Sequence, residues 1–170
     1  DLIRSRGLGD VYKRQHWIQK NFQMIIRPGK KSDIPQVFQL ITELAEYEKA
    51  LDKVSNTVEK LEEDGFGPNP VYELFVAEIE NNIVGIALTY YRFSTWRGKV
   101  MYLEDLILKE HMRRKGIGKK LFDMVLDHAK VTSCVGLSLQ VLDWNDLGIN
   151  FYKKYNMEFD DEWINCYLEF

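Results

Sequence analysis

The pattern of apolar and polar positions predicts two amphipathic helices in the first part of the chain. In the first, apolar residues recur three or four positions apart and therefore share one helix face: Val37, Leu40, Ile41, Leu44 and Ala45. Ser32 precedes this pattern as an N-cap, so we expect a helix from there to about Glu48. A shorter helix is expected over residues 57–64, with Gly65 as its C-cap.

A β-like pattern follows and predicts an antiparallel meander. The segments 72–80, 83–93 and 99–108 are rich in β-forming residues and are separated by short turns. Asn81 and Asn82 suit the first turn because Asn tolerates positive φ. A further strand is expected at residues 24–28, ahead of the first helix.

The rest of the chain combines helical patterns with short β-like segments. One helix face is marked by Ile117, Leu121, Val125 and Ala129, and this helix is expected to end near residue 130. A strand, a helix and two final strands are expected at residues 136–142, 147–155, 157–159 and 163–170. The order predicts one α/β domain with a mixed, mostly antiparallel sheet of six to seven strands and about four flanking helices.

Length and composition agree with a single domain. A chain of 170 residues with 45% hydrophobic residues can bury one core but is short for two ordinary domains. Its apolar runs are far shorter than the roughly 20 residues of a membrane-spanning helix, so no membrane association is expected.

Residues 1–23 are expected to lie outside the folded domain. The run SRGLGDVYKRQ at residues 5–15 resembles the translation of a sequencing-library adapter, and it lacks the periodicity of a packed element. A native flexible tail is the alternative interpretation. We therefore divide the chain into a leader, residues 1–23, and one domain, residues 24–170, for which Met24 is a natural start.

Charge and cysteine usage narrow the class of protein. The chain has a formal net charge of −3, but residues 1–23 carry two acids and five Lys or Arg, which leaves −6 for the domain. An acidic domain disfavours nucleic-acid binding, because nucleic-acid-binding proteins neutralise phosphates with basic residues. Cys134 and Cys166 fit a reducing, cytoplasmic compartment better than a disulfide framework. The histidines are isolated, so no metal site is expected.

The segment RRKGIG, residues 113–118, carries the most specific chemical signal. It joins a predicted strand to a predicted helix, where glycines allow close approach and the free N–H groups of the first helical turn bind anions. Arg113, Arg114 and Lys115 add positive charge, so the loop can cradle a pyrophosphate; a plain basic loop is the alternative. A Walker P-loop is excluded because Lys120 replaces its hydroxyl residue, and a dinucleotide fingerprint would need a third glycine.

This segment resembles the acetyl-CoA pyrophosphate motif R/Q-x-x-G-x-G/A of the GNAT superfamily of N-acetyltransferases. Other segments follow the order and spacing seen in the spermidine/spermine and thialysine acetyltransferases: DGFG at 64–67, STWRGK at 94–99, YLEDLIL at 102–108, VLDWN at 141–145 and INFYKKYN at 149–156. The resemblance covers residues 24–170. It implies the GNAT fold, acetyl-CoA as cosubstrate, and direct transfer of the acetyl group to an amine.

The resemblance implies catalytic roles for two residues. Tyr152 matches the general acid that protonates the departing CoA thiolate, although a tyrosine on a helix can also serve packing alone. Glu104 matches the acid proposed to take the proton of the amine, and its alternative role is only to attract the cation. A base is needed because an alkyl amine with a pKa near 10.4 is only about one part in a thousand neutral at pH 7.

The resemblance also implies residues that hold acetyl-CoA. In the pyrophosphate loop they are Arg113, Arg114, Lys115, Gly116, Ile117 and Gly118. The strand whose backbone pairs with the CoA arm is matched by Leu106, Ile107 and Leu108, for which an ordinary buried strand is the alternative. Asn145 and Lys154 match further CoA contacts, although a lysine late in a helix often interacts only with the helix dipole.

A third group matches the residues that line the amine pocket. Its members are Tyr47, Glu48, Trp96, Asp105 and Asp161. Carboxylates beside aromatic rings suit a multiply charged cation, whereas the alternative for each carboxylate is a solvated surface charge.

The sequence thus predicts an N-acetyltransferase for a small cationic amine, such as a diamine, a polyamine or a thialysine-like amino acid. One alternative acceptor is the lysine or N-terminal amine of a protein or peptide. A noncatalytic acyl-CoA-binding module is a second alternative, which the presence of Tyr152 disfavours. The resemblance further implies a homodimer.

Overall fold

The computed structural model describes residues 24–168, and these divide into two compact units with the boundary between Ser138 and Leu139. We call residues 24–138 unit 1 and residues 139–168 unit 2. The predicted leader, residues 1–23, lies outside the described residues, as do residues 169–170. In the described part, no helix has both the length and the apolar character needed to cross a membrane.

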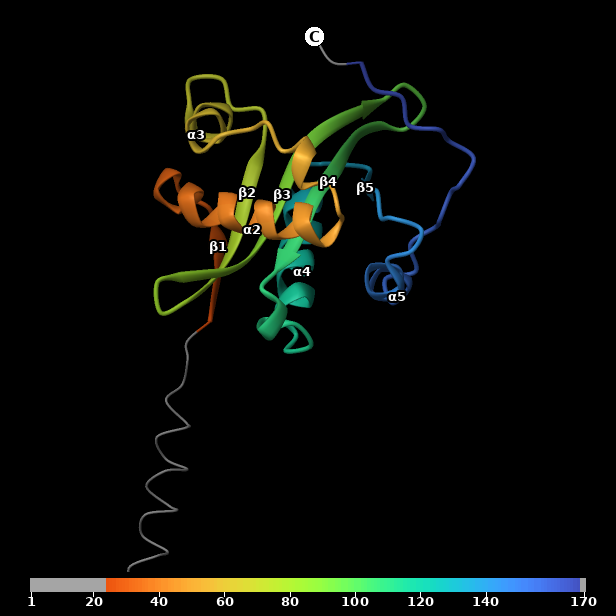
Figure 1. The fold of residues 1–170 in the computed structure, drawn as a ribbon. Helices are drawn as coiled ribbons and strands as arrows, with labels where there is room; N and C mark the ends of the chain where they lie inside the picture. The colour runs from red at the N-terminus through yellow and green to blue at the C-terminus, as the bar shows by residue number, and fades with distance from the viewer. Residues whose placement is uncertain (1–23, 169–170) are drawn as a thin grey trace, which may run out of the picture. The chain divides into compact units, whose positions relative to one another are not determined.

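Unit 1 is built on a sheet in which the described residues form five strands, placed side by side in chain order (Figure 1). The strands are β1 (Ile25–Pro28), β2 (Glu73–Ile79), β3 (Asn82–Ser94), β4 (Gly98–Leu108) and β5 (Gly136–Leu139). From β1 to β4, each strand pairs with the next in antiparallel orientation. The predicted meander of β2, β3 and β4 is therefore confirmed.

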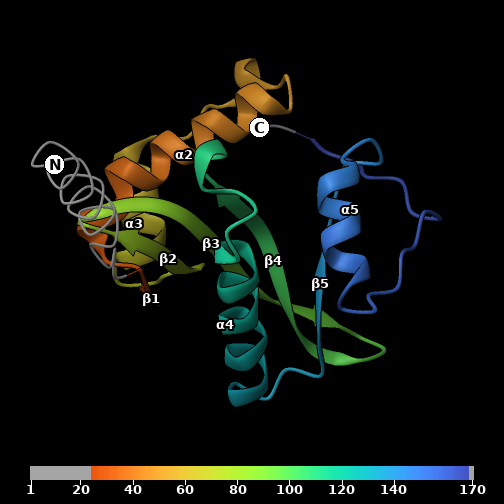
Figure 2. The same ribbon diagram turned by 90° about the horizontal axis from the view of Figure 1, so that it is seen from below.

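Helices cover both faces of this sheet. They are α2 (Ile34–Tyr47), α3 (Val58–Phe66) and α4 (Ile117–Val131), and Figure 2 shows α2 and α4 on opposite sides of the strands. Apolar side chains of α2 and α3, such as Leu40 and Leu61, pack against Ile86 of β3. The preceding residue, Gly85, faces α4, since a side chain at this position would approach Leu121.

The core on the α4 side is formed by side chains that are fully shielded from solvent. Leu121, Phe122 and Val125 each have an exposed fraction of 0%. Their spacing is the helical repeat that the sequence predicted, which explains why one face of α4 packs against the sheet. Truncation of a side chain such as Phe122 to alanine typically costs about 3–5 kcal/mol of stability.

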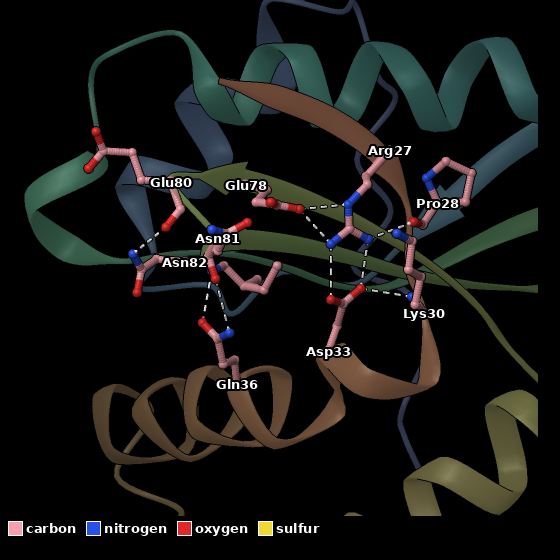
Figure 3. Close-up of polar contacts among 10 residues, drawn as sticks. Arg27, Pro28, Lys30, Asp33, Gln36, Glu78, Glu80, Asn81 and Asn82 are labelled. Carbon is pink, nitrogen blue, oxygen red and sulfur yellow. Dashed lines mark hydrogen bonds and ion pairs between the residues drawn. The ribbon is translucent and has the colours of Figure 1, made fainter. Parts of the chain in front are cut away.

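A three-residue charge network fixes the start of α2 to the sheet. Arg27 of β1 donates to Asp33 (2.7 and 3.0 Å) and to Glu78 of β2 (2.7 Å), as Figure 3 shows. The carboxylate of Asp33 also accepts the backbone N–H of Lys30 at 2.7 Å. These hydrogen bonds, led by that from Arg27, hold the pKa of Asp33 below its ordinary value.

The same network explains why the predicted N-cap at Ser32 is wrong. Residues Lys31–Asp33 form a 3₁₀ turn, and α2 begins at Ile34 with Asp33 as its N-cap residue. Because Asp33 is held by Arg27 and by the backbone of Lys30, it closes the turn before the helix starts. The predicted end of the helix is confirmed, since Glu48 is the C-cap residue.

The turn between β2 and β3 lies one residue earlier than predicted. The residues with positive φ are Glu80 (49°) and Asn81 (64°), whereas Asn82 already belongs to β3. Gln36 of α2 holds this turn, because its amide donates to the Asn81 carbonyl (3.3 Å) and accepts from the Ile83 N–H (2.9 Å; Figure 3). Helix α2 therefore holds both ends of the β2–β3 connection.

Helix α3 begins as predicted and ends later. The hydroxyl of Thr57 accepts the N–H of Lys60 at 3.2 Å and caps the first turn. Gly65 lies inside the helix, and Gly67 is the C-cap residue. A side chain at position 65 would overlap the ring of Tyr72, so this glycine serves close packing and not helix termination.

Unit 2 contains α5 (Asp146–Lys153) and long stretches without regular structure. The predicted strands at residues 157–159 and 163–170 are wrong for the described residues, and β5 ends at Leu139 and not at residue 142. The described sheet thus has five strands where six to seven were expected. Side chains such as Trp163 (76% exposed) and Ile164 (90%) have the β-like composition, but a strand also requires a neighbour that pairs with it.

Candidate active site

The predicted site residues form two groups, one in each unit. Unit 1 holds Glu104, the loop of residues 113–118 and most residues predicted to contact the amine. Unit 2 holds Asn145, Tyr152, Lys154 and Asp161.

A β-bulge in β4 directs two of the predicted site residues. Leu103 lies opposite Thr89 and Asp105 lies opposite Leu88, so Glu104 is an extra residue with no counterpart in β3. A bulge bends its strand and redirects the side chains around it. It places two consecutive carboxylates here, with Glu104 exposed and Asp105 half-buried.

Glu48, Glu104 and Asp105 form a cluster of like charges, which we call the carboxylate cluster. Burial raises the pKa of Asp105 to about 7, with smaller contributions from the negative charges of Glu104 and Glu48. Partial burial also raises the pKa of Glu48 at the end of α2. None of the three forms an ion pair with another described residue. Such a cluster favours the binding of a cation.

Two tyrosines and one arginine extend from this cluster along β3 and β4. The hydroxyl of Tyr90 donates to Glu104 Oε2 at 2.9 Å, and its ring lies 5.1 Å from that of Tyr102 between centroids. Burial, and then the bond to Glu104, raise the pKa of Tyr90, so its hydroxyl keeps its proton and acts as a donor. The guanidinium of Arg92 lies 5.9 Å from the centroid of the Tyr102 ring.

The sequence analysis missed Tyr90, Arg92 and Tyr102 as residues of the site. A signal was present, because Tyr90 and Arg92 are two positions apart on β3 and therefore share a face of the sheet. Tyr102 lies directly opposite Tyr90 in β4. Only the register between the strands shows that this face continues to Glu104.

The loop before α4 fits the binding of a pyrophosphate. Arg114 (φ 60°) and Gly116 (φ 77°) adopt left-handed backbone conformations. Gly116 is the N-cap residue of α4, which has no side-chain cap and no acidic residue in its first turn. The first N–H groups of α4 therefore receive no protein side chain as acceptor. Arg114 and Lys115 are exposed and form no ion pair with a described residue. This combination provides backbone donors and positive charge for an anion.

The structure brings the predicted CoA strand next to this loop. A side chain at Gly118 would lie 3.2 Å from Leu108, so the first turn of α4 packs against the end of β4. β5 begins beside the opposite end of β4, where the carbonyl of Lys99 accepts the N–H of Val135 at 2.9 Å. Leu106, Ile107 and Leu108 pair with Ala87, Ile86 and Gly85 of β3. Their pairing with the CoA arm stays a prediction.

One contact joins the pyrophosphate loop to the residues predicted to line the amine pocket. The guanidinium of Arg113 lies over the ring of Tyr47, 5.4 Å from its centroid. Tyr47 is the last residue of α2 and precedes Glu48 of the carboxylate cluster. Figure 2 shows the loop before α4 near this end of α2. The two predicted subsites of unit 1 are therefore in contact.

Trp96 lies apart from these residues along the sheet. It is in the turn that joins β3 to β4, and its side chain is 88% exposed. Several residues of β4 separate it from Glu104. Its assignment to the amine pocket stays a prediction.

In unit 2, the predicted residues surround α5. Tyr152 is buried within this helix, with its ring 5.2 Å from that of Phe151 between centroids. Asn145 is the N-cap, and its side-chain oxygen accepts the N–H of Gly148 at 3.1 Å. Lys154 is the C-cap residue, and Asp161 lies exposed in the irregular segment that follows. Asn145 thus has a structural role in addition to its predicted contact with CoA.

Comparisons with known proteins identify the family of the chain. A model of the acetyltransferase (GNAT) family matches residues 36–157. The chain is 41% identical over 138 residues to a thialysine N-epsilon-acetyltransferase of Bos taurus, which covers 76% of this chain and 81% of that protein. It is 34% identical over 134 residues to the spermidine/spermine N(1)-acetyltransferase-like protein 1 of Homo sapiens, which covers 75% of this chain and 19% of that protein.

Among solved structures, the aminoglycoside N-acetyltransferase AAC(6')-Iy in complex with CoA has a similar fold. The TM-score is 0.67 at 17% identity, over 89% of this chain and 97% of that chain. The fold and the sequence matches together define an acetyltransferase. The chain belongs to the acetyltransferase (GNAT) family, whose members use acetyl-CoA as acetyl donor.

Proposed function

We propose that this protein transfers an acetyl group from acetyl-CoA to a primary amine of a small cationic molecule, such as a diamine, a polyamine or a thialysine-like amino acid. The carboxylate cluster carries this proposal. Glu48, Glu104 and Asp105 have no basic partner among the described residues, and the pKa of Asp105 is raised to about 7. A cationic acceptor would relieve this repulsion.

Glu104 is the candidate base for the attacking amine. Its carboxylate is exposed at the bulge and is oriented by the hydroxyl of Tyr90. An ammonium group must lose a proton before its nitrogen can attack a carbonyl carbon. Glu104 would take that proton directly or through water, while Asp105 and Glu48 hold a second positive charge of the acceptor.

The residues that would hold acetyl-CoA are the loop of residues 113–118 and the backbone of β4 at Leu106, Ile107 and Leu108. Acetyl-CoA supplies a thioester whose carbonyl carbon accepts the amine and whose sulfur leaves. The uncapped start of α4 and the charges of Arg114 and Lys115 suit its pyrophosphate. Asn145 and Lys154 stay predicted contacts.

Tyr152 is the candidate proton donor. A thiolate leaves more readily when a nearby acid gives it a proton, and the phenol hydroxyl can supply one. Glu104, the pyrophosphate loop and Tyr152 all lie within residues 36–157, the segment that the acetyltransferase family model matches. The acceptor class is supported by the name of one relative, a thialysine N-epsilon-acetyltransferase, and by similarity to a spermidine/spermine N(1)-acetyltransferase-like protein.

The test is a thiol-release assay with acetyl-CoA and a panel of acceptors. Diamines, polyamines, lysine and thialysine should exceed a monoamine of equal length by about tenfold in kcat/KM, with a margin that shrinks as salt rises. Tyr152→Phe should lower kcat by about 10²–10⁴-fold and leave the affinity for acetyl-CoA unchanged. Equal rates for mono- and dicationic amines, or faster acetylation of peptide lysines, would contradict the proposed acceptor class.

We also infer a cytoplasmic homodimer. Cys134 and Cys166 are both free thiols in the structure, which suits a reducing compartment. Light scattering of the purified full chain tests the dimer, and a monomer at micromolar concentration would overturn it.

A further inference from the structure

Arg92 is a positive charge on the same face as the carboxylate cluster. It lies on β3 two residues after Tyr90, the partner of Glu104. Its side chain is exposed, and its guanidinium forms no hydrogen bond or ion pair with another described residue. Its contact is the ring of Tyr102, 5.9 Å from guanidinium to centroid.

A free arginine is out of place on a surface that binds only polycations. Every positive charge of a diamine or polyamine would be repelled by Arg92 while being attracted by Glu48, Glu104 and Asp105. An arginine in this position suits an acceptor that carries a negative group at one end and an amine at the other. Arginine matches a carboxylate well, because its planar fork can donate two parallel hydrogen bonds.

We propose that Arg92 binds the α-carboxylate of an amino-acid acceptor whose terminal amine is acetylated beside Glu104. This inference rests on the proposed function and narrows its acceptor class to ω-amino amino acids. The carboxylate cluster then receives the terminal ammonium group, and Arg92 receives the α-carboxylate. Tyr90 and Tyr102 form the apolar surface between the two ends.

The spacing along the strands suits such an acceptor. Residues two apart on a strand are separated by about 7 Å, which is the step from Tyr90 to Arg92. An extended chain of five bonds spans about 6 Å at ordinary bond lengths. This backbone step is comparable to the length of a lysine-like side chain. The two charged groups are linked by contacts, because Glu104 bonds to Tyr90, the ring of Tyr90 lies beside that of Tyr102, and Arg92 lies near the ring of Tyr102.

Tyr102 keeps the guanidinium in place for this role. Tyr102 is 8% exposed, and its ring also contacts the ring of Tyr90, 5.1 Å away between centroids. A cation over an aromatic face loses fewer conformations on binding an anion than a fully solvated arginine does. The N–H groups of the guanidinium form no hydrogen bond with another described residue and remain available for a carboxylate.

The test compares acceptors that differ only in the carboxylate. Lysine, lysinamide and cadaverine share the terminal amine and its spacer, but only lysine carries the negative group. Arg92→Met keeps most of the side-chain length and removes the charge. We expect this change to lower kcat/KM for lysine by about tenfold, mainly through KM, and to leave lysinamide and cadaverine unchanged or up to about threefold better.

Arg97→Met is the matched control, because Arg97 is an exposed arginine of the same hairpin, in the turn between β3 and β4. It should change the ratio of kcat/KM for lysine to kcat/KM for cadaverine by less than about twofold. An Arg92→Met protein with an unchanged ratio, or an equal change from Arg97→Met, would overturn the inference.

If the unaltered protein acetylates none of the three amines, the proposed function fails instead, so the two failures are distinguishable. Arg92→Lys should restore part of the ratio, which a loss of folding would not allow.

Discussion

Two groups of charged residues in unit 1 are built in opposite ways. In the network at the start of α2, Arg27 lies between Asp33 and Glu78 and bonds to both at 2.7 Å. In the carboxylate cluster, Glu48, Glu104 and Asp105 have no basic partner among the described residues. The first group lowers the pKa of Asp33, whereas the second raises that of Asp105 to about 7.

The difference separates residues that stabilise the fold from residues that we propose bind the acceptor. A carboxylate with a lowered pKa is more favourable in the folded state when it is ionised. A carboxylate with a raised pKa costs stability when it is ionised, and the cost is relieved only by protonation or by a bound cation. Paired charge thus stabilises the fold here, and the unpaired like charge supports the proposed binding site for a cationic acceptor.

The largest effect is expected from Glu104→Gln in the carboxylate cluster. It removes the candidate base and leaves the hydrogen-bond acceptor for Tyr90 in place. We expect kcat/KM for a dicationic amine to fall by about 100-fold or more at pH 7, as measured by thiol release.

Glu43→Gln is the control for this substitution, since Glu43 is an exposed carboxylate of α2 outside the cluster. It should change kcat/KM by less than about twofold. A fall of less than threefold for Glu104→Gln, with the same pH profile as the unaltered protein, would leave Glu104 without a role as base.

In the paired network, Arg27→Met should lower the free energy of unfolding by about 2 kcal/mol. The change leaves Asp33 and Glu78 without their cation, and their side chains are only 9% and 17% exposed. Chemical denaturation measures the effect. Lys31→Met is the matched control, because the ion pair of Lys31 with Glu62 is exposed (64% for Lys31) and should contribute less than about 0.5 kcal/mol.

The pH dependence follows from the lowered pKa of Asp33. The stability contributed by this carboxylate is present above its ordinary pKa of about 4 and is lost as the pH falls through the lower pKa of the folded state. The Arg27→Met protein should therefore lose less stability than the unaltered protein on acidification below pH 4. Parallel losses in the two proteins would show that the network does not contribute.

The paired network also shows what the sequence could and could not predict. The apolar repeats of α2 and α4 and the β-forming composition of β2, β3 and β4 are local signals. The corresponding elements form within a few residues of the predicted bounds. The N-cap at Ser32 was wrong because Asp33 is held by Arg27, and Arg27 is in turn held by Glu78 of β2, which is 51 residues away from it in the chain. Long-range partners of this kind leave no local pattern.

Sequence motifs predicted part of the candidate site, and the pairing register of β3 and β4 adds the remaining residues. The segment RRKGIG forms the start of α4 as expected, and Glu104 and Asp105 lie on β4. Which face they take depends on the bulge at Glu104, which the sequence does not mark. Arg92 can be assigned to the same face as Glu104 only when the pairing of β3 with β4 is known. The final predicted strands fail for a related reason, since a β-like segment needs a partner strand.

A medium effect is expected from Asp105→Asn, which should separate function from stability. The pKa of Asp105, at about 7, is above its ordinary value, so the folded protein loses stability as the pH rises from about 4 to 7. Asparagine removes that cost, and the melting temperature should rise at pH 8 but not at pH 4.

The same variant should bind a cationic amine less well, with KM about tenfold higher at pH 8. Thermal unfolding at both pH values and thiol release at pH 8 provide the two measurements. A lower melting temperature at pH 8 would contradict the assignment of Asp105 as a costly, unpaired charge.

The smallest effect concerns the contact between the carboxylate cluster's helix and the pyrophosphate loop. Arg113 approaches this cluster, yet it lies over the ring of Tyr47 at 5.4 Å and forms no ion pair with Glu48. A cation–π contact at an exposed site contributes about 0.5–1 kcal/mol, so Tyr47→Leu should weaken acetyl-CoA binding by about threefold in calorimetric titration. Tyr47→Phe keeps the ring and should bind acetyl-CoA with unchanged affinity, which makes it the matched control.

If both variants weaken binding equally, the tyrosine hydroxyl and not the ring is responsible, and the ring does not position Arg113. If neither variant changes the affinity, Arg113 is positioned by its own loop, and the comparison between paired and unpaired charge does not extend to the cofactor site.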